Sequence, residues 1–334
     1  MNIQINDSKI FYKKFSVESC KNAFFVIDLK VDQIYQISKT LPIQKILIIR
    51  SGEKTKSFSG LYRILKFFID NEISKNDEIF AVGGGSLLDL VGFATSIYKR
   101  GLTLNFVPTT LLSMADAAIG GKNAINYQTY KNLLGTIYLP NSITIDLNFL
   151  KTLPKKHLIS GYFEILKVSM LKSSEFFFDL INKSPISFYN KNLIDIIKTS
   201  IDFKLTIIKN DLFDYNLRKI LNFGHTIGHA IELNYKLTHG LSVGYGMKYS
   251  LMLSEMYLGL SNHILTTYIN HLFKHKIYFK HNFDSELIIK NLKYDKKSKA
   301  NYIEIILLED IGKPIIYQIE YEQFINDIQN LLKS

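Results

Sequence analysis

The chain has 334 residues, 47% of them hydrophobic and 21% charged, with a formal net charge of +11. This balance is ordinary for a folded protein with room for two domains, and it excludes a disordered or low-complexity chain. No apolar run approaches the ~18 residues of a transmembrane helix, and residues 1–7 lack the charged and apolar regions of a signal peptide. We therefore expect a cytoplasmic protein with no membrane partner.

A net positive charge is typical of proteins that bind nucleic acid, but the distribution of the charges along this chain does not favour such a partner. The lysines are scattered along the chain, and no nucleic-acid-binding motif accompanies them. A basic protein also attracts small anions. Phosphates and carboxylates are the expected ligands, and the single Cys20 agrees with a reducing compartment.

Short apolar runs alternate with helical patterns through the first half of the chain. Short buried strands that alternate with helices are typical of a parallel sheet covered on both faces. The predicted strands are residues 24–28, 45–50, 78–82, 105–108 and 142–146, and the predicted helices are about 58–69 and 90–94.

Three glycines, Gly83 to Gly85, follow the third of these runs. In parallel sheets a glycine-rich turn after a strand exposes backbone N–H groups at a helix N-terminus, where a pyrophosphate binds. The turn lacks the usual GxGxxG spacing, so a bare tight turn remains an alternative. Asp28 and Glu53 also come at the ends of strand-like runs. Their carboxylates are candidate acceptors for ribose hydroxyls, and the alternative is that both are exposed loop acids without a role.

A second group of polar residues follows the strand at 105–108. Asp116, Lys122, Lys131 and Asn132 are placed in polar turns, where they resemble the rim of an anion site. Any one of them is also compatible with a solvated loop.

After Pro154 the pattern changes to long helical periodicities, so we place a domain boundary near Lys151. The predicted helices are 157–170, 192–208, 216–233 and 242–257, and a hairpin is predicted from 302–308 and 314–319.

The predicted helix 216–233 carries the strongest chemical signal. Arg218, Asn222, His225, His229 and Glu232 recur at helical spacing and would share one face. A histidine pair at i, i+4 presents two imidazole nitrogens to one divalent cation, and His239 follows soon enough to add a third.

The glycines in this segment strengthen the metal interpretation over a chance histidine pair. Gly224 and Gly228 flank the pair, where glycine costs a helix roughly 0.5 to 1 kcal/mol. Another backbone or a ligand must therefore come close.

Glu164 and Lys167 lie at i, i+3 on an otherwise apolar helix. A surface ion pair would explain them, at ~0.2 to 0.5 kcal/mol. A carboxylate on an apolar helix is also a suitable ligand for a histidine-bound cation.

Taken in order, the motifs resemble the 3-dehydroquinate synthase family over nearly the whole chain. The matching segments are Gly83–Gly85 with Asp89, Arg100-Gly101, Pro108–Thr110, Asp116 to Lys122, Lys131-Asn132, Leu150–Pro154, Gly161–Lys167, Leu221–Glu232 and His239-Gly240.

The resemblance implies two domains and a reaction. Residues 1–151 would form an α/β, Rossmann-like NAD-binding domain, and residues 152–334 a mainly α-helical metal- and substrate-binding domain. The enzyme would convert 3-deoxy-D-arabino-heptulosonate 7-phosphate to 3-dehydroquinate and phosphate. Its cofactors would be NAD and one divalent metal ion, zinc or cobalt.

The resemblance also implies roles for individual residues. The metal ligands match Glu164, His225 and His239. The catalytic and substrate-contacting positions match Asp116, Lys122, Asn132, Lys167, Lys204, Asp214, Arg218, Asn222 and His229, with one of Lys296 and Lys297 on the phosphate. The NAD-binding positions match Ser51, Gly52, Glu53, Lys54, Thr55, Lys56, Gly85, Ser86, Leu87, Leu88, Asp89, Thr109, Thr110, Lys122, Lys131, Phe149, Leu150, Lys151 and Thr152. Arg100 matches an arginine that reaches the substrate phosphate of a neighbouring subunit, which implies a homodimer.

The chain departs from the family pattern at a few positions. Leu88 replaces a glycine, Asn216 replaces another, Leu241 replaces a glutamate and Asp214 stands where a glutamate is usual. None of these changes removes a metal ligand, so they bear on loop geometry more than on the type of reaction.

Related proteins provide the competing interpretations. Metal-dependent alcohol and glycerol dehydrogenases share the glycine turn, but Lys122, Lys131 and the pair Glu164 and Lys167 favour a phosphorylated substrate. Other sugar-phosphate cyclases are closer, and Asn222 with His229 favours dehydroquinate synthase over them. A basic binding protein without catalysis is the alternative from another class.

Overall fold

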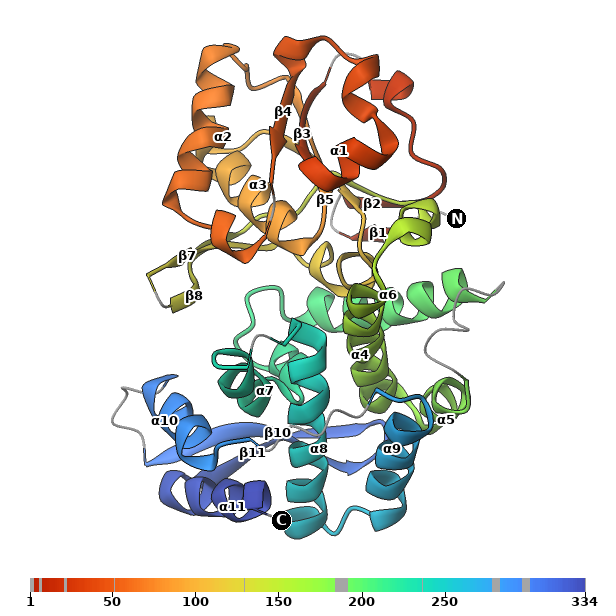
Figure 1. The fold of residues 1–334 in the computed structure, drawn as a ribbon, viewed down its shortest axis with the longest axis vertical. Coiled ribbons are helices and arrows are strands. Elements are labelled where there is room, and N and C mark those ends of the chain that lie inside the picture. The colour runs from red at the N-terminus through yellow and green to blue at the C-terminus, as the bar shows by residue number, and fades with distance from the viewer. Residues whose placement is uncertain are drawn as a thin grey trace. The chain divides into compact units, whose positions relative to one another are not determined.

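The computed structural model describes residues 3–5, 8–20, 23–50, 52–128, 130–183, 192–235, 237–277, 283–295 and 301–333. The chain divides into two compact units, Met1–Pro154 and Lys155–Ser334. Figure 1 shows the first unit in red to yellow and the second in green to blue. Within the described ranges, no helix is both long enough and apolar enough to span a bilayer.

The first unit is built on a seven-stranded sheet with the strand order β1-β2-β9-β6-β5-β3-β4. All its neighbouring strands pair in parallel except β1 and β2. The strands are β1 (Ile3–Ile5), β2 (Ser8–Tyr12), β3 (Phe24–Asp28), β4 (Ile46–Ile49), β5 (Glu78–Gly83), β6 (Thr103–Pro108) and β9 (Ser142–Ile145). This sheet confirms the parallel arrangement predicted from the apolar runs.

Helices cover both faces of this sheet. They are α1 (Leu29–Tyr35), α2 (Phe58–Asp70) and α3 (Gly85–Ile97). From β3 the chain moves to the edge strand β4 through α1, and it then returns past β3 to β5 through α2. Because both crossovers are right-handed and run in opposite directions, α1 lies on one face of the sheet and α2 on the other. The step from β5 to β6 runs in the same direction as the return, which places α3 beside α2, as Figure 1 shows.

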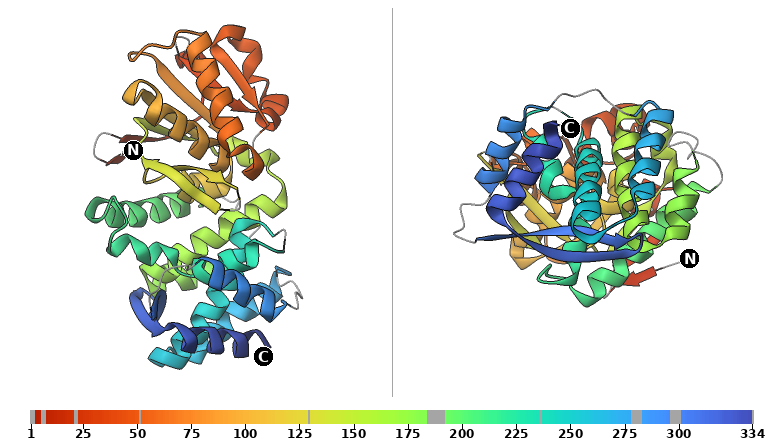
Figure 2. Two further views of the ribbon diagram at one scale, coloured as in Figure 1. Left: turned by 90° about the vertical axis from the view of Figure 1, so that its left-hand side faces the viewer. Right: turned by 90° about the horizontal axis from the view of Figure 1, so that it is seen from below.

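The hairpin of β7 (Lys122–Tyr127) and β8 (Tyr130–Ile137) packs against α3. A Cβ at Gly92 of α3 would lie 1.9 Å from Asn123 Oδ1, so helix and hairpin are in close contact. The prediction that Lys122, Lys131 and Asn132 lie in polar turns was wrong, because they lie on these strands. The side chains of these three residues are exposed, as they would be in a loop, and Figure 2 draws the hairpin in yellow.

The second unit consists of helices around a central one, α8, with one β-hairpin. Its elements are α4 (Lys155–Lys172), α5 (Ser174–Ile181), α6 (Leu193–Asn210), α7 (His225–Glu232), α8 (His239–Leu258), α9 (Asn262–Lys274), α10 (Ser285–Asp295), β10 (Tyr302–Asp310), β11 (Lys313–Glu320) and α11 (Tyr321–Lys333). Helix α8 contacts α4, α7, α9, α11 and β10 (Figure 2). The predicted hairpin is confirmed.

Helix α4 is buried along most of its length. All residues from Ser160 to Leu171 are buried, which is typical of a helix enclosed by its neighbours. Glu164 and Lys167 therefore lie in the interior of the unit, and the alternative of a surface ion pair was wrong.

Candidate metal and substrate site

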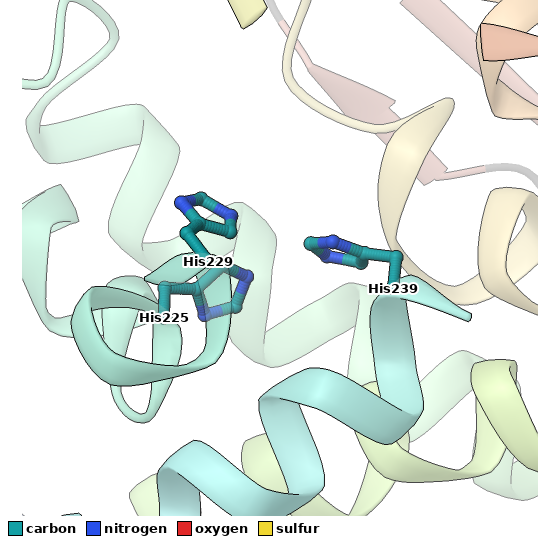
Figure 3. A group of neighbouring side chains, drawn as sticks. All are labelled: His225, His229 and His239. Carbon is teal, nitrogen blue, oxygen red and sulfur yellow. The ribbon is translucent and has the colours of Figure 1, made fainter. Parts of the chain in front are cut away.

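Three helices of the second unit bring the candidate metal ligands together. Glu164 comes from α4, His225 and His229 from α7, and His239 from the first residue of α8. Glu164 Oε1 lies 3.7 Å from His225 Nε2 and 3.4 Å from His239 Nε2. Figure 3 shows the three imidazole rings facing one another.

The predicted continuous helix 216–233 was wrong. Residues Leu217–Asn222 form a 3-10 helix, Gly224 has a φ of 76°, and α7 begins only at His225. A Cβ at Gly224 would lie 2.8 Å from the backbone nitrogen of Met247 on α8. Glycine occupies this position because α8 leaves no room for a Cβ, and its left-handed backbone separates the 3-10 helix from α7.

This break changes which residues share a face. His225 and His229 stay together on α7, whereas Arg218 and Asn222 belong to the preceding 3-10 helix. The close approach expected at the flanking glycines is confirmed. A Cβ at Gly228 would lie 2.9 Å from the carbonyl oxygen of Ser242 on α8.

The geometry of Glu164, His225 and His239 fits a divalent metal ion. Zinc bonds to nitrogen and oxygen are about 2.0 to 2.2 Å, so tetrahedral ligand atoms lie about 3.4 Å apart. The separations of 3.4 and 3.7 Å from Glu164 Oε1 are close to this value. Among the described residues, buried Oε1 has no hydrogen-bond partner, and an unmet buried carboxylate oxygen is costly unless a cation meets it.

Neighbouring groups orient each of these ligands. Lys167 Nζ lies 2.6 Å from Glu164 Oε2, His225 Nδ1 lies 3.2 Å from the carbonyl oxygen of Phe223, and His239 Nδ1 lies 3.1 Å from Glu232 Oε2. Such contacts fix the ring tautomer and direct the other nitrogen at a metal. Sequence reasoning placed Glu232 near the histidines but assigned it no role.

The charges in this cluster depend on one another. Burial tends to raise the pKa of the Glu164 carboxyl, but Lys167, His239 and His225 together hold that pKa well below its ordinary value. Burial, with the nearby Lys167 ammonium, lowers the pKa of His225 well below its usual value, so its ring is neutral. Glu164 thus presents a charged oxygen and His225 a lone pair, the forms in which both residues bind metals.

His239 behaves differently while no cation is bound. Burial tends to lower the pKa of its ring, but the carboxylates of Glu164 and Glu232 raise that pKa to about 10. A metal ion at this position would therefore replace a proton.

His229 is the exposed member of the group. Its ring centroid lies 5.2 Å from that of His225 and 5.6 Å from that of His239. One ligand atom from each of the three histidines lies within 4.8 Å of the others, so the geometry also allows an all-histidine set. We favour Glu164, and not His229, as the third metal ligand, because its buried Oε1 has no hydrogen-bond partner among the described residues. His229 is then available to act on a bound substrate.

Further candidate residues of the second unit lie on α6 and in the segment between α6 and α7. Arg218 is buried, and its Nη1 donates to the carbonyl oxygen of Leu212 at 2.5 Å. Asp214 has a left-handed backbone with a φ of 66°. Lys204 is buried on α6, whereas Asn222 is exposed.

Asp211 organises this segment and was missed by sequence reasoning. Its carboxylate accepts hydrogen bonds from the backbone N–H groups of Tyr215, Asn216 and Arg218. These bonds, led by the one from Arg218, lower the pKa of the Asp211 carboxyl. An aspartate just after a helix and before a polar turn is the sequence signal that could have indicated this role.

In the first unit the glycine turn lies between β5 and α3, as predicted. Gly84 is the N-cap residue and Gly85 the first residue of α3. Cβ atoms at these two positions would lie 3.1 Å from Thr110 Cγ2 and from Ala117 Cβ, respectively. Leu87 and Leu88 are buried in the core, so a dinucleotide at this turn would meet backbone N–H groups rather than these side chains.

Other expected cofactor positions follow β6 and β9 or lie on the β7–β8 hairpin. Thr109 is buried and its N–H donates to the carbonyl oxygen of Gly83 at 2.9 Å. Phe149 and Leu150 are buried in a 3-10 helix, Leu147–Thr152, while Lys151 and Thr152 are exposed. Lys122 and Lys131 are exposed on the hairpin.

The two suggested ribose acceptors are already engaged. Asp28 caps α1, where its Oδ1 accepts from the N–H groups of Lys30 and Val31 at 2.8 and 3.1 Å. Glu53 Oε1 accepts from Asn126 Nδ2 at 2.7 Å. The N-cap position explains why an acid ends the strand at Asp28.

Asp116 lies in a π-helical turn, Ser113–Ala117, and not in an open loop. Such turns are frequent at functional sites. Of the other expected contacts, Ser51, Lys296 and Lys297 lie outside the described residues.

Comparison with known proteins decides the family. A family model described as 3-dehydroquinate synthase N-terminal matches residues 46–160, and one described as 3-dehydroquinate synthase C-terminal matches residues 161–298. The chain belongs to the 3-dehydroquinate synthase family. A 3-dehydroquinate synthase from Picrophilus torridus is 38% identical and is aligned over 95% of this chain and 92% of its own length.

Solved structures of two related cyclases share the fold of this 3-dehydroquinate synthase family member. One is a 2-deoxy-scyllo-inosose synthase in complex with carbaglucose-6-phosphate, NAD+ and Co2+, with a TM-score of 0.85 and 24% identity over 99% of this chain and all of the other. The other is a 2-epi-5-epi-valiolone synthase from Streptomyces hygroscopicus with NAD+ and Zn2+, with a TM-score of 0.87 and 23% identity over 99% and 97% of the two chains. The comparisons confirm the family, the fold class and the reaction that the ordered motifs implied.

Proposed function

We propose that this chain is a cytoplasmic, homodimeric enzyme that converts 3-deoxy-D-arabino-heptulosonate 7-phosphate to 3-dehydroquinate and phosphate with NAD and one divalent metal ion. Membership of the family supports the reaction. The observation that carries the site is the buried Glu164 Oε1, which lies 3.7 and 3.4 Å from ring nitrogens of His225 and His239.

Glu164, His225 and His239 would hold the metal ion. A carboxylate with two imidazoles suits zinc or cobalt, and the two related cyclases hold Co2+ and Zn2+. When bound, the ion supplies Lewis-acid polarisation of substrate oxygens. Lys167 keeps Glu164 ionised, and Glu232 and the Phe223 carbonyl orient the two rings.

The glycine turn of the first unit would bind NAD, which both related cyclases contain. Gly84 and Gly85 let the backbone approach a pyrophosphate at the N-terminus of α3. When bound, NAD would supply transient redox chemistry with no net formation of NADH.

The remaining residues of the second unit would bind the substrate and move protons. The exposed ring of His229 lies beside the metal ligands, where an imidazole can accept and donate a proton as a relay requires. Arg218 carries the planar donor set that suits a carboxylate. Lys204 adds positive charge for an anionic substrate.

Arg100 is the residue on which the proposed homodimer depends. It is exposed, and both it and Lys99 have left-handed backbones, with φ of 63° and 47°. Such strain, about 1 to 3 kcal/mol per residue, persists mostly at functional sites. An exposed arginine held in this way is suited to reach a phosphate in a second subunit.

A complementation experiment tests the shared site. Arg100→Ala and His225→Ala would each be inactive alone, but a mixed dimer has one site with both residues intact. Unfolding and refolding the two variants together should restore phosphate release. A mixture as inactive as its components would contradict an arginine supplied by the partner.

Phosphate release from 3-deoxy-D-arabino-heptulosonate 7-phosphate tests the reaction itself. We expect release to require both NAD and zinc or cobalt, to yield 3-dehydroquinate without net NADH, and to be lost in His225→Ala. Net NADH formation would favour a dehydrogenase, and no release from folded, metal-loaded protein would contradict the proposal.

A further inference from the structure

One buried lysine of the first unit connects the turn after β4 to α3 and to the β7–β8 hairpin. Lys56 is 4% exposed, and its Nζ lies 2.5 Å from Asp89 Oδ2 on α3. The same ammonium donates a hydrogen bond to Asn132 Oδ1 on β8. A buried ammonium with these two partners is held in one position, because leaving either interaction would strand a charge away from water.

The backbone around Lys56 reinforces this connection through Asn126. The N–H of Asn126 donates to the carbonyl oxygen of Lys56 at 2.8 Å. Asn126 Oδ1 accepts from the N–H of Asn132 at 2.9 Å, and its Nδ2 donates to Glu53 Oε1 at 2.7 Å. Asn132 is thus held by its backbone and by its side chain, in a left-handed conformation with a φ of 54° that asparagine tolerates.

The chemistry of lysine decides which end of the Asn132 amide meets a ligand. An ammonium only donates hydrogen bonds, so the oxygen of the amide must face Lys56. The N–H groups of the amide are then the part that remains for a ligand. Such donors suit the anionic oxygens of a phosphate or carboxylate, whereas the opposite orientation would present an acceptor and repel them.

We infer that Lys56 is a positioning residue, which acts through Asn132 by holding the amide with its N–H donors toward the substrate. This inference rests on the proposed function and on the family resemblance, which matches Asn132 to a substrate-contacting position and Asp89 to an NAD-binding position. It differs from a direct contact of Lys56 with the dinucleotide, because the ammonium is already shared between Asp89 and Asn132.

Two substitutions separate the roles of the lysine and the amide. Lys56→Met keeps the length of the side chain and removes its donor. Asn132→Asp keeps an acceptor for Lys56 but removes the N–H groups. Each should raise the substrate KM about tenfold, with kcat changed less than about threefold, as expected when a ground-state contact is lost. Lys56→Arg, which retains a cationic donor, should recover part of the loss.

A double-substitution cycle tests whether Lys56 acts through Asn132. Asn132→Ala should raise the dissociation constant of the substrate about tenfold in the parent but less than about twofold in Lys56→Met, because coupled contacts are not additive. Calorimetric titration of the metal-free, NAD-loaded protein measures this constant without turnover. Lys66→Met is the matched control, since it removes an exposed lysine–aspartate pair, with Asp70, on α2.

Hydrogen exchange of the hairpin supplies a readout that needs no substrate. Lys56→Met should speed backbone exchange in peptides that cover residues 122–137, and Lys66→Met should not. Additive effects of Lys56→Met and Asn132→Ala, or unchanged hairpin exchange, would overturn the inference while leaving the proposed function intact. If the parent releases no phosphate, the proposed function fails, and the exchange comparison still decides whether Lys56 holds the hairpin.

Discussion

Ser160 on α4 and Gly240 on α8 are in direct backbone contact. The N–H of Gly240 donates to Ser160 Oγ at 3.0 Å, and a Cβ at Gly240 would lie 1.9 Å from the carbonyl oxygen of Ser160. Glu164 follows Ser160 by one helical turn, and His239 immediately precedes Gly240. This contact therefore sets the distance between the candidate ligand carboxylate and the imidazole of His239.

Gly240→Ala should open the candidate metal site. The added methyl group forces α4 and α8 apart, which we expect to destabilise the protein by about 1 to 3 kcal/mol or more and to abolish retention of the metal ion. Urea denaturation and metal analysis after gel filtration measure the two effects. Ser160→Ala is the control, because it removes only a hydrogen bond worth about 1 kcal/mol. Full metal retention by Gly240→Ala would contradict the role of this contact.

Glu164→Gln should cost both metal binding and stability. The substitution leaves the ammonium of Lys167, which is 2% exposed, without its carboxylate, at a cost of about 3 to 5 kcal/mol. The double variant Glu164→Gln/Lys167→Met should regain much of the free energy of unfolding but no activity. Urea denaturation of the three proteins decides the point, and a double variant no more stable than the single one would contradict a buried ion pair.

Glu232→Gln should weaken the metal site without removing a ligand. Glu232 Oε2 lies 3.1 Å from His239 Nδ1 and orients that ring. Loss of such a partner typically lowers metal affinity about 10- to 100-fold. Competition with a chelator measures the affinity, with Glu255→Gln near the far end of α8 as the control. Equal affinities in parent and Glu232→Gln would show that this contact does not orient the ligand.

His271 should make the protein less stable in mild acid. Burial, with smaller effects of His275 and Lys274, lowers the pKa of its ring from 6.5 to about 4, and its Nε2 lies 2.6 Å from the hydroxyl of Tyr162. Between pH 4 and pH 6.5, the His271 ring is therefore protonated in the unfolded chain but neutral in the folded protein. Stability from this group is present above pH 6.5 and is lost as the pH falls to about 4, by about 3 kcal/mol.

Denaturant unfolding at a series of pH values tests this dependence. His271→Gln should show a shallower loss of unfolding free energy between pH 6.5 and 4 than the parent, whereas His263→Gln should follow the parent. His263 is the matched control because it is exposed on the same helix. Parallel pH profiles for the parent and His271→Gln would contradict the lowered pKa.

The parts of the fold that follow local rules were predicted from the sequence. Strand β3 has the predicted bounds, Phe24–Asp28, and the hairpin β10–β11 spans the predicted segments. Buried parallel strands appear as short apolar runs, and the hairpin shows turn residues between two such runs. The predicted helix from 216 to 233 was wrong because its pattern is helical throughout, whereas the left-handed backbone of Gly224, packed against α8, separates two shorter helices.

The sequence by itself determined the family, the reaction and the residue types of the candidate site, because spacing within one helix and the order of the motifs are local properties. Only the tertiary structure placed Glu164 Oε1 between His225 and His239, buried the ion pair of Glu164 with Lys167 and joined Lys56 to Asn132. Glu164 and Lys167 lie within one turn of α4, whereas the other partners lie dozens of residues apart in the sequence. These relationships depend on how closely helices and hairpins pack, which no single stretch of sequence specifies.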